Sequence, residues 1–104
     1  MAPKRTPTIL AQAQDGLGRT VVLTDVRWAH IVEGHEALDG YELALMRAVE
    51  TADRSRDGNF SGATVLYARG LGPARWLAVV VAYKDGRGEI ITAYPQTKEP
   101  KGTT

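Results

Sequence analysis

The sequence predicts an α+β domain in which two N-terminal helices pack on a curved antiparallel sheet of four to five strands. Helical spacing of apolar residues is confined to the first half of the chain, whereas the second half alternates short apolar runs with glycine-containing turns. The predicted order is β-β-α-α-β-β-β, and a chain of 104 residues supports a single hydrophobic core.

The N-terminal part of the chain predicts a β-hairpin followed by a helix. Ile9–Gln14 and residues 19–23 are short apolar or β-branched runs, and the Asp-Gly-Leu-Gly of residues 15–18 is the turn signal between them. Thr24 is expected to cap the helix, and Gly34 is expected to end it. The apolar spacing places four residues on one helical face: Trp28, Ile31, Val32 and His35.

A second helix is predicted from a capping-box spacing, in which Asp39 caps the helix and Glu42 reaches back to it. Its apolar stripe consists of Leu38, Tyr41, Leu45, Met46 and Val49. Residues 53–59 show no periodicity and are expected to form a loop.

Three strands are predicted in the second half. Ala63–Arg69 alternates partly, and residues 75–84 contain an unbroken apolar run typical of a central strand covered on both faces. The Asp-Gly-Arg-Gly of residues 85–88 is a hairpin turn before a last strand at residues 89–95. We therefore expect one domain over residues 9–95, with a flexible arm at residues 1–8 and a flexible tail at residues 96–104.

Composition excludes several kinds of site. The chain has no cysteine, so disulfides, thiolate nucleophiles and cysteine zinc sites are excluded. No apolar stretch reaches the roughly 20 residues of a membrane span, and we expect a cytoplasmic protein with no membrane partner. The net charge of +1 does not by itself indicate a nucleic-acid-binding protein. Acids outnumber bases in residues 20–52 and bases outnumber acids in residues 53–104, which indicates either one basic face or a solvated surface with local pairing.

The two histidines, His30 and His35, are the scarce groups that titrate near neutral pH, and they lie five residues apart. On one straight helix they are offset by about 140°, so they cannot both face one metal ion, and no metal is expected. His35 could pack at the helix end, and His30 could be an exposed surface residue. The alternative is that one of them is a general acid or base.

Polar groups on the final strand suggest a site. Ile90, Thr92 and Tyr94 are expected to share one face, although Thr92 and Tyr94 also suit a purely structural role in a strand. Arg69 and Lys84 lie at the ends of predicted strands, where solvated charges are common. A histidine, a cation and hydroxyls on a curved sheet are nevertheless what metal-free RNA cleavage uses, with the cation holding the phosphate.

The string Trp-Ala-His-Ile of residues 28–31, followed by His35 and Glu36, resembles the W-x-H-I-x-x-x-H-P-E signature of small phage-associated domains. Leu66 with Tyr67, and the Ile-Thr-Ala-Tyr of residues 91–94, follow in the matching order. These domains are phage members of the barnase/EndoU/colicin/RelE-like (BECR) nuclease superfamily. The resemblance extends roughly from residue 18 to residue 94, and the proline after the second histidine is missing here.

The resemblance implies a helix pair followed by a curved antiparallel sheet and metal-independent ribonuclease activity of toxin or mobile-element type, without a cofactor. The implied partners are RNA and a cognate antitoxin or immunity protein. The residues expected to be catalytic are His35, His30, Thr92 and Tyr94. The bases expected from their positions to bind substrate are Arg69, Arg75 and Lys84.

We expect His35 rather than His30 to be the principal acid or base, because Gly34 lets the chain turn toward the strand that carries Thr92 and Tyr94. Two other interpretations stay open. The fold could serve as a non-catalytic RNA- or protein-binding module, or the histidine pair could be structural only. Convergence of a histidine, Thr92 and a basic side chain within about 10 Å around one cleft distinguishes catalysis from these alternatives.

Overall fold

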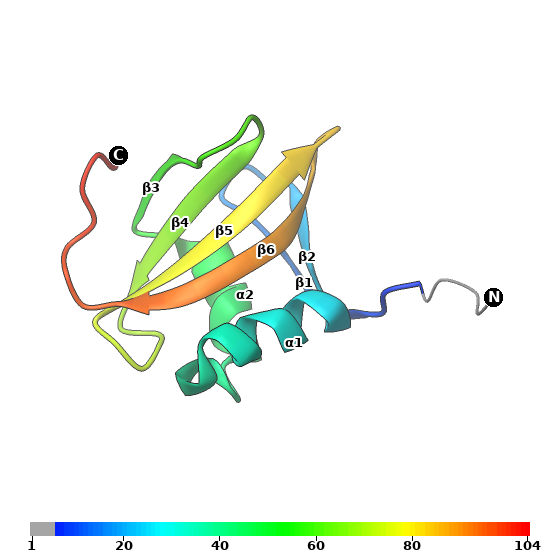
Figure 1. Ribbon diagram of the computed structural model, residues 1–104. Coiled ribbons are helices and arrows are strands. Elements are labelled where there is room, and N and C mark those ends of the chain that lie inside the picture. Colours follow the sequence, from blue (N-terminus) through cyan, green and yellow to red (C-terminus); the bar gives the residue numbers. More distant parts are fainter. Residues whose placement is uncertain (1–5) are drawn as a thin grey trace.

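A six-stranded mixed sheet organises the chain, which the computed structural model describes over residues 6–104 (Figure 1). The strands are β1 (Ile9–Gln14), β2 (Thr20–Thr24), β3 (Arg54–Asp57), β4 (Ala63–Arg69), β5 (Trp76–Lys84) and β6 (Arg87–Gln96). The helices are α1 (Asp25–Gly34), the short 3-10 helix η1 (Glu36–Leu38) and α2 (Glu42–Thr51). The strand order is β1-β2-β6-β5-β4-β3, which confirms the α+β class.

The sheet differs from the prediction in strand number and direction. Residues 54–57, expected in a loop, form β3, which pairs with β4 along one edge of the sheet. Strand pairing is formed by backbone hydrogen bonds and does not require alternating apolar residues. The polar sequence of this edge strand therefore gave no sign of a strand. The last strand also joins the N-terminal hairpin, because residues 20–22 of β2 pair in parallel with residues 87–89 of β6. The connection between them contains both helices, as a parallel pair requires.

The first helix follows the prediction closely. The Thr24 side chain accepts a hydrogen bond from the Arg27 backbone N–H at 3.2 Å, and α1 ends at Gly34. The predicted capping box of the second helix is wrong: Asp39 closes the 3-10 turn, Gly40 takes a φ of +87°, and α2 begins only at Glu42. No helix among residues 6–104 has the length and apolar character to cross a membrane.

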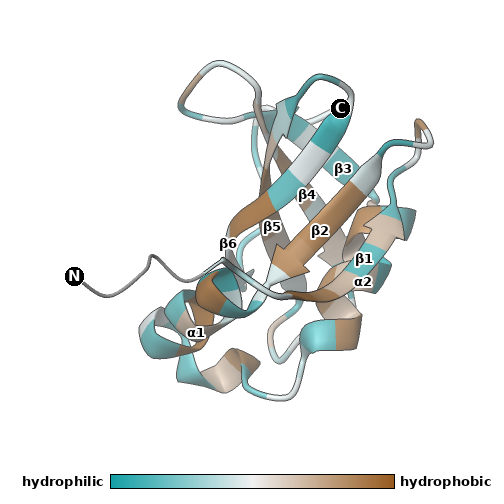
Figure 2. Cartoon of the chain, turned by 90° about the vertical axis from the view of Figure 1, so that its right-hand side faces the viewer, coloured by the Kyte–Doolittle hydropathy of each residue, from teal (hydrophilic) through white to brown (hydrophobic). Residues whose placement is uncertain are grey.

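One face of the sheet carries the main core. Helix α2 lies behind β4 and β5, whereas α1 runs beside β6 beyond its short pairing with β2 (Figure 1). Among the strands, β2 and β5 carry the most apolar stretches (Figure 2). The sheet contributes Val21, Leu23, Leu66, Ala68, Leu77, Val79, Val81, Ile90 and Ala93 to this core, and the helical region contributes Ile31, Leu38, Leu45, Met46, Ala48 and Val49.

A β-bulge in β6 separates its two faces. Val80 pairs with Thr92 and Val81 pairs with Ile90, so Ile91 is an extra residue on β6. Ile90 and Ala93 are therefore both fully buried in the main core, whereas Thr92 and Tyr94 lie on the opposite face. The expectation that Ile90 shares a face with Thr92 and Tyr94 is wrong, because the simple alternation stops at the bulge.

A buried carboxylate fixes the turn between β1 and β2 to the rest of the sheet. One Asp15 oxygen accepts from the Leu17 and Arg19 backbone N–H groups, and the other accepts from the Arg19 side chain at 2.8 Å and the Tyr83 hydroxyl at 2.9 Å. The Arg19 guanidinium also lies 3.8 Å from the centre of the Tyr83 ring. Burial, and then the bond to Asp15, raise the pKa of Tyr83 to about 12, so its hydroxyl remains a donor at neutral pH.

Both termini contact the domain. Residues 1–5 of the expected arm lie outside the described residues, but Thr8 exchanges backbone and side-chain hydrogen bonds with Asp25. At the other end Thr104 exchanges two backbone hydrogen bonds with Ser55 of β3, at 2.9 and 3.0 Å. Pro100 is buried, and Glu99 forms an ion pair with Arg54. The expected flexibility of residues 96–104 stays a prediction about motion, and these contacts oppose it.

The bulge predicts different costs for two adjacent isoleucines. Ile90→Ala is expected to lower the free energy of unfolding by about 3 kcal/mol, because it leaves a cavity in a fully buried position. Ile91→Ala, the same change at a half-buried position, is expected to cost about 1 kcal/mol. Urea unfolding of both variants measures the difference. Equal losses would contradict the separation of faces at Ile91.

Asp15 predicts a pH-dependent stability. Burial alone would raise the pKa of this carboxyl, but hydrogen bonds from Arg19, Tyr83 and Leu17 outweigh burial and hold it below its ordinary value of 3.8. The charged form thus stabilises the fold above about pH 4, and that contribution is lost as the pH falls further. Asp15→Asn is expected to cost about 2 kcal/mol at neutral pH.

The difference in unfolding free energy between wild type and Asp15→Asn should shrink toward zero by about pH 2. Urea unfolding at a series of pH values measures it, with Asp57→Asn at an exposed carboxyl as the control. A difference that stays constant from neutral to acidic pH is incompatible with this role for Asp15.

Candidate functional site on the open sheet face

The sheet face opposite α2, here called the open face, is formed by four adjacent strands, of which β3, β4 and β6 contribute polar side chains. Two rows of paired residues cross it from β3 to β6. Named in the strand order β3, β4, β5, β6, the first row consists of Arg54, Tyr67, Ala78 and Tyr94. The second row, in the same order, consists of Arg56, Val65, Val80 and Thr92. Because paired residues on neighbouring strands lie about 5 Å apart, each row is a continuous surface. The apolar members form a second small core, and the polar members at both ends remain partly accessible.

Arg56, Tyr67 and Tyr94 form the centre of this face. The Arg56 Nε–H donates to the Tyr67 hydroxyl at 2.8 Å, and this bond raises the pKa of Arg56, so the guanidinium remains charged. Burial, and then a hydrogen bond with Tyr67, raise the pKa of Tyr94, while the charge of Arg56 opposes them. Tyr94 is therefore a neutral phenol at physiological pH, suited to donating a hydrogen bond rather than accepting a proton.

The end of α1 brings a histidine to the same place. His35 is the residue after the last helical position, with a φ of −143°, and its backbone N–H still donates to Ile31. Its ring centre lies 6.3 Å from that of Tyr94, with the rings tilted by 41°. The side chain is exposed, so it can reach solvent and a bound molecule. The helix end at Gly34 thus gives His35 the position beside Tyr94 that its sequence context suggested.

Two cavities flank the central pair Arg56 and Tyr94, and both are lined by them. The first, of about 280 Å³, is also lined by Phe60, Ile91 and Thr92. The second, of about 560 Å³, lies toward the end of β6, between Tyr67 and the C-terminal segment. A ligand bound over Arg56 and Tyr94 could therefore extend in both directions.

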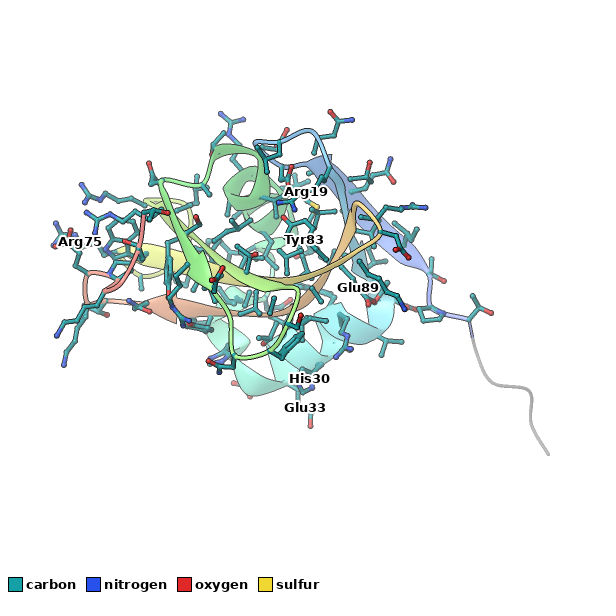
Figure 3. All side chains as sticks on the ribbon, turned by 90° about the horizontal axis from the view of Figure 1, so that it is seen from above. Arg19, His30, Glu33, Arg75, Tyr83 and Glu89 are labelled. Atoms are coloured by element: carbon teal, nitrogen blue, oxygen red, sulfur yellow. The ribbon has the colours of Figure 1, made fainter. Side chains whose placement is uncertain are left out.

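The structure brings together three of the four residues expected to be catalytic. His35 lies beside Tyr94, and Thr92 is two residues from Tyr94 on the same face and lines the same cavity as Arg56. His30 is exposed on α1, where Figure 3 shows it with Glu33 on the helix. Within residues 6–104 no contact links His30 to the cluster.

The three bases expected to bind substrate do not form the centre of the site. Arg69 lies at the margin of the open face, 4.8 Å from the Trp76 ring, and Arg75 lies at the rim of the molecule (Figure 3). Lys84 lies six residues along β5 from Ala78, or about 20 Å at the rise of a strand. Ala78 is the residue paired with Tyr94, so Lys84 is at the opposite end of the sheet.

Two residues of the cluster are missing from the sequence prediction. Arg56 lay in the expected loop, and Tyr67 appeared only in the strand motif of the family resemblance, with no role in the site assigned to it. The available signal was the alternation of Arg54 and Arg56, which places both on one face if the segment is extended. Nothing local shows that Tyr67 and Tyr94 meet, because they belong to strands separated by β5.

The arrangement combines an obligate cation, two phenols, an aliphatic hydroxyl and an imidazole around a groove. Such a set can hold a tetrahedral anion by charge-assisted hydrogen bonds and can accept or donate a proton near neutral pH. Among residues 6–104 no three histidine, aspartate or glutamate side chains are grouped as metal ligands. No family model matches the chain, and no curated protein or solved structure matches it either.

Proposed function

We propose that this protein is a metal-independent endoribonuclease of the BECR kind, acting on the phosphodiester of single-stranded RNA. The observation that supports it best is the convergence of His35, Tyr94 and Arg56 beside Thr92 on the open face. An accessible sheet face with aromatic and cationic side chains suits an unpaired strand, whose bases and backbone are both exposed.

In this proposal Arg56 binds the scissile phosphate and His35 takes the proton of the adjacent 2′-hydroxyl. The 2′-oxygen then bonds to phosphorus and the bond to the 5′-oxygen breaks, which leaves a 2′,3′-cyclic phosphate. The leaving 5′-oxygen takes up a proton from water, and the proton that His35 accepted passes to solvent, so the step is balanced without a further reactant. The Tyr94 and Thr92 hydroxyls donate to the phosphate oxygens, where charge develops in the transition state.

The biological setting that fits this activity is a toxin or mobile-element nuclease in the cytoplasm, restrained by an antitoxin or immunity protein. A second candidate is an RNA-binding module without catalysis. The observation in its favour is that His35 is the one imidazole in the described cluster, whereas a paired acid and base would be more efficient.

Incubation with a fluorogenic oligoribonucleotide in EDTA tests the proposal. We expect wild type to cleave it and His35→Ala to lower kcat/KM by about 10²- to 10⁴-fold, the usual contribution of a general acid or base. His30→Ala, an identical change five residues away on α1, should retain activity within about two-fold. Both histidines are exposed, so neither change should shift the melting temperature by more than about 3 °C.

Three outcomes discriminate among the candidates. Binding of a non-cleavable oligonucleotide without cleavage of RNA would favour the binding module. Loss of activity in His30→Ala but not in His35→Ala would reverse the roles of the two histidines. RNA that is neither bound nor cleaved by wild type would remove the support for both functions.

A further inference from the structure

We propose that the C-terminal segment, residues 97–101, completes the RNA site by forming a subsite for a phosphate next to the scissile one. The inference rests on the proposed function, because it names a further part of the same substrate. It starts from the larger cavity on the open face, of about 560 Å³. One wall of this cavity is Arg56, Tyr67 and Tyr94, and the facing wall is the C-terminal segment itself.

Hydrogen bonds from residues just before and just after the segment hold it in place. At its start the Gln96 side chain donates to the Lys98 carbonyl at 2.8 Å, which fixes the turn out of β6. Beyond it, Thr104 pairs with Ser55 through two backbone hydrogen bonds. Figure 1 shows the segment leaving β6 and returning toward β3.

The middle of the segment is held by Arg54. Its guanidinium forms an ion pair with Glu99 and lies 5.2 Å from the centre of the buried Trp76 ring. A guanidinium held between a carboxylate and an aromatic ring is restrained by both the charge and the ring face. Pro100, next to Glu99, is buried. These contacts hold the segment as a wall of the cavity.

The charge of the cavity favours an anion. Glu99 is neutralised by Arg54, so the unopposed charges on the walls are those of Arg56, Lys98 and Lys101. Within residues 6–104 neither lysine forms an ion pair, and both side chains are exposed. A lysine held near a site but free to reorient is suited to binding a phosphate oxygen as a point charge.

The larger cavity adjoins the site of the scissile phosphate, so the anion that fits it best is the next phosphate of the same RNA strand and not a separate ligand. Arg56 and Tyr94 line both cavities, so a strand bound with its scissile phosphate over this pair extends into the basic cavity on one side. On the other side it meets the smaller cavity, which is lined by Phe60, Ile91 and Val80 and suits a base. The neighbouring phosphate then lies within reach of Lys98 and Lys101.

The test compares the double variant Lys98→Ala/Lys101→Ala with a control of equal charge change, Arg47→Ala/Arg87→Ala. Arg47 lies on α2 and Arg87 at the start of β6, and both are exposed and outside the described cavities of the site. The probe is a labelled 2′-O-methyl oligoribonucleotide of about eight nucleotides, which has no 2′-hydroxyl to react. Fluorescence anisotropy over a range of salt concentrations gives Kd and its salt dependence.

We expect Lys98→Ala/Lys101→Ala to weaken binding about five-fold and to reduce the slope of log Kd against log salt by about 1, as for the loss of one or two phosphate contacts. Cleavage of a dinucleotide, whose single phosphate lies over Arg56, should change by less than about two-fold. Lys98→Glu/Lys101→Glu should weaken oligonucleotide binding further. Melting temperatures of all variants should stay close to that of wild type, because the substituted side chains are exposed.

Failure of the inference and failure of the proposed function give different results. If wild type binds or cleaves RNA and the lysine variants match the arginine control, the subsite is disproved while the nuclease proposal stands. If the lysine variants impair the dinucleotide as strongly as the oligonucleotide, the lysines act at the scissile phosphate and the subsite is again disproved. If wild type neither binds the probe nor cleaves RNA, both proposals fail.

Discussion

The extra residue in β6 is the constraint on which both faces of the sheet depend. A regular strand would place Ile90 on the same side as Thr92 and Tyr94, and either the core would lose an isoleucine or the open face would lose its hydroxyls. With Ile91 as a bulge, Ile90 and Ala93 both face the helices while Thr92 and Tyr94 face outward. Bulges also bend the strand and increase its twist, which suits a curved surface for a ligand.

Strand β6 also contacts the N-terminal half of the chain, through β2 and α1. Its beginning pairs in parallel with β2, and this leaves its later half free for α1 to lie alongside. The end of α1 therefore falls next to Tyr94, so that His35 reaches the open face from a helix that packs against the sheet edge. The cluster is thus built on regular elements, which hold side chains more firmly than loops do.

Two arginine–tyrosine pairs, Arg19 with Tyr83 and Arg56 with Tyr67, have different roles in the structure. Tyr83 donates to Asp15 beneath the stacked Arg19, so every charged group there has a partner and the cluster fastens the N-terminal hairpin to β5. On the open face Arg56 binds Tyr67 through one N–H, and no carboxylate of residues 6–104 forms a salt bridge with it. Arg56 also donates to the Asp57 backbone carbonyl, which carries no formal charge. A cation without a carboxylate partner retains the capacity to bind an anion, whereas Arg19, paired with Asp15, does not.

The sequence by itself determined the α+β class, the hairpin, the first helix with its Thr24 cap, and the central strands, because these follow from local spacing and turn chemistry. It also indicated His35, Thr92 and Tyr94, which have distinctive side chains in short motifs. Only the tertiary structure decided which residues meet: the bulge that reorients Ile90, the parallel pair, and the edge strand that carries Arg56. The physical reason is that strand pairing is made by backbone groups that every residue has, so neither the partner nor the register is written in the local sequence.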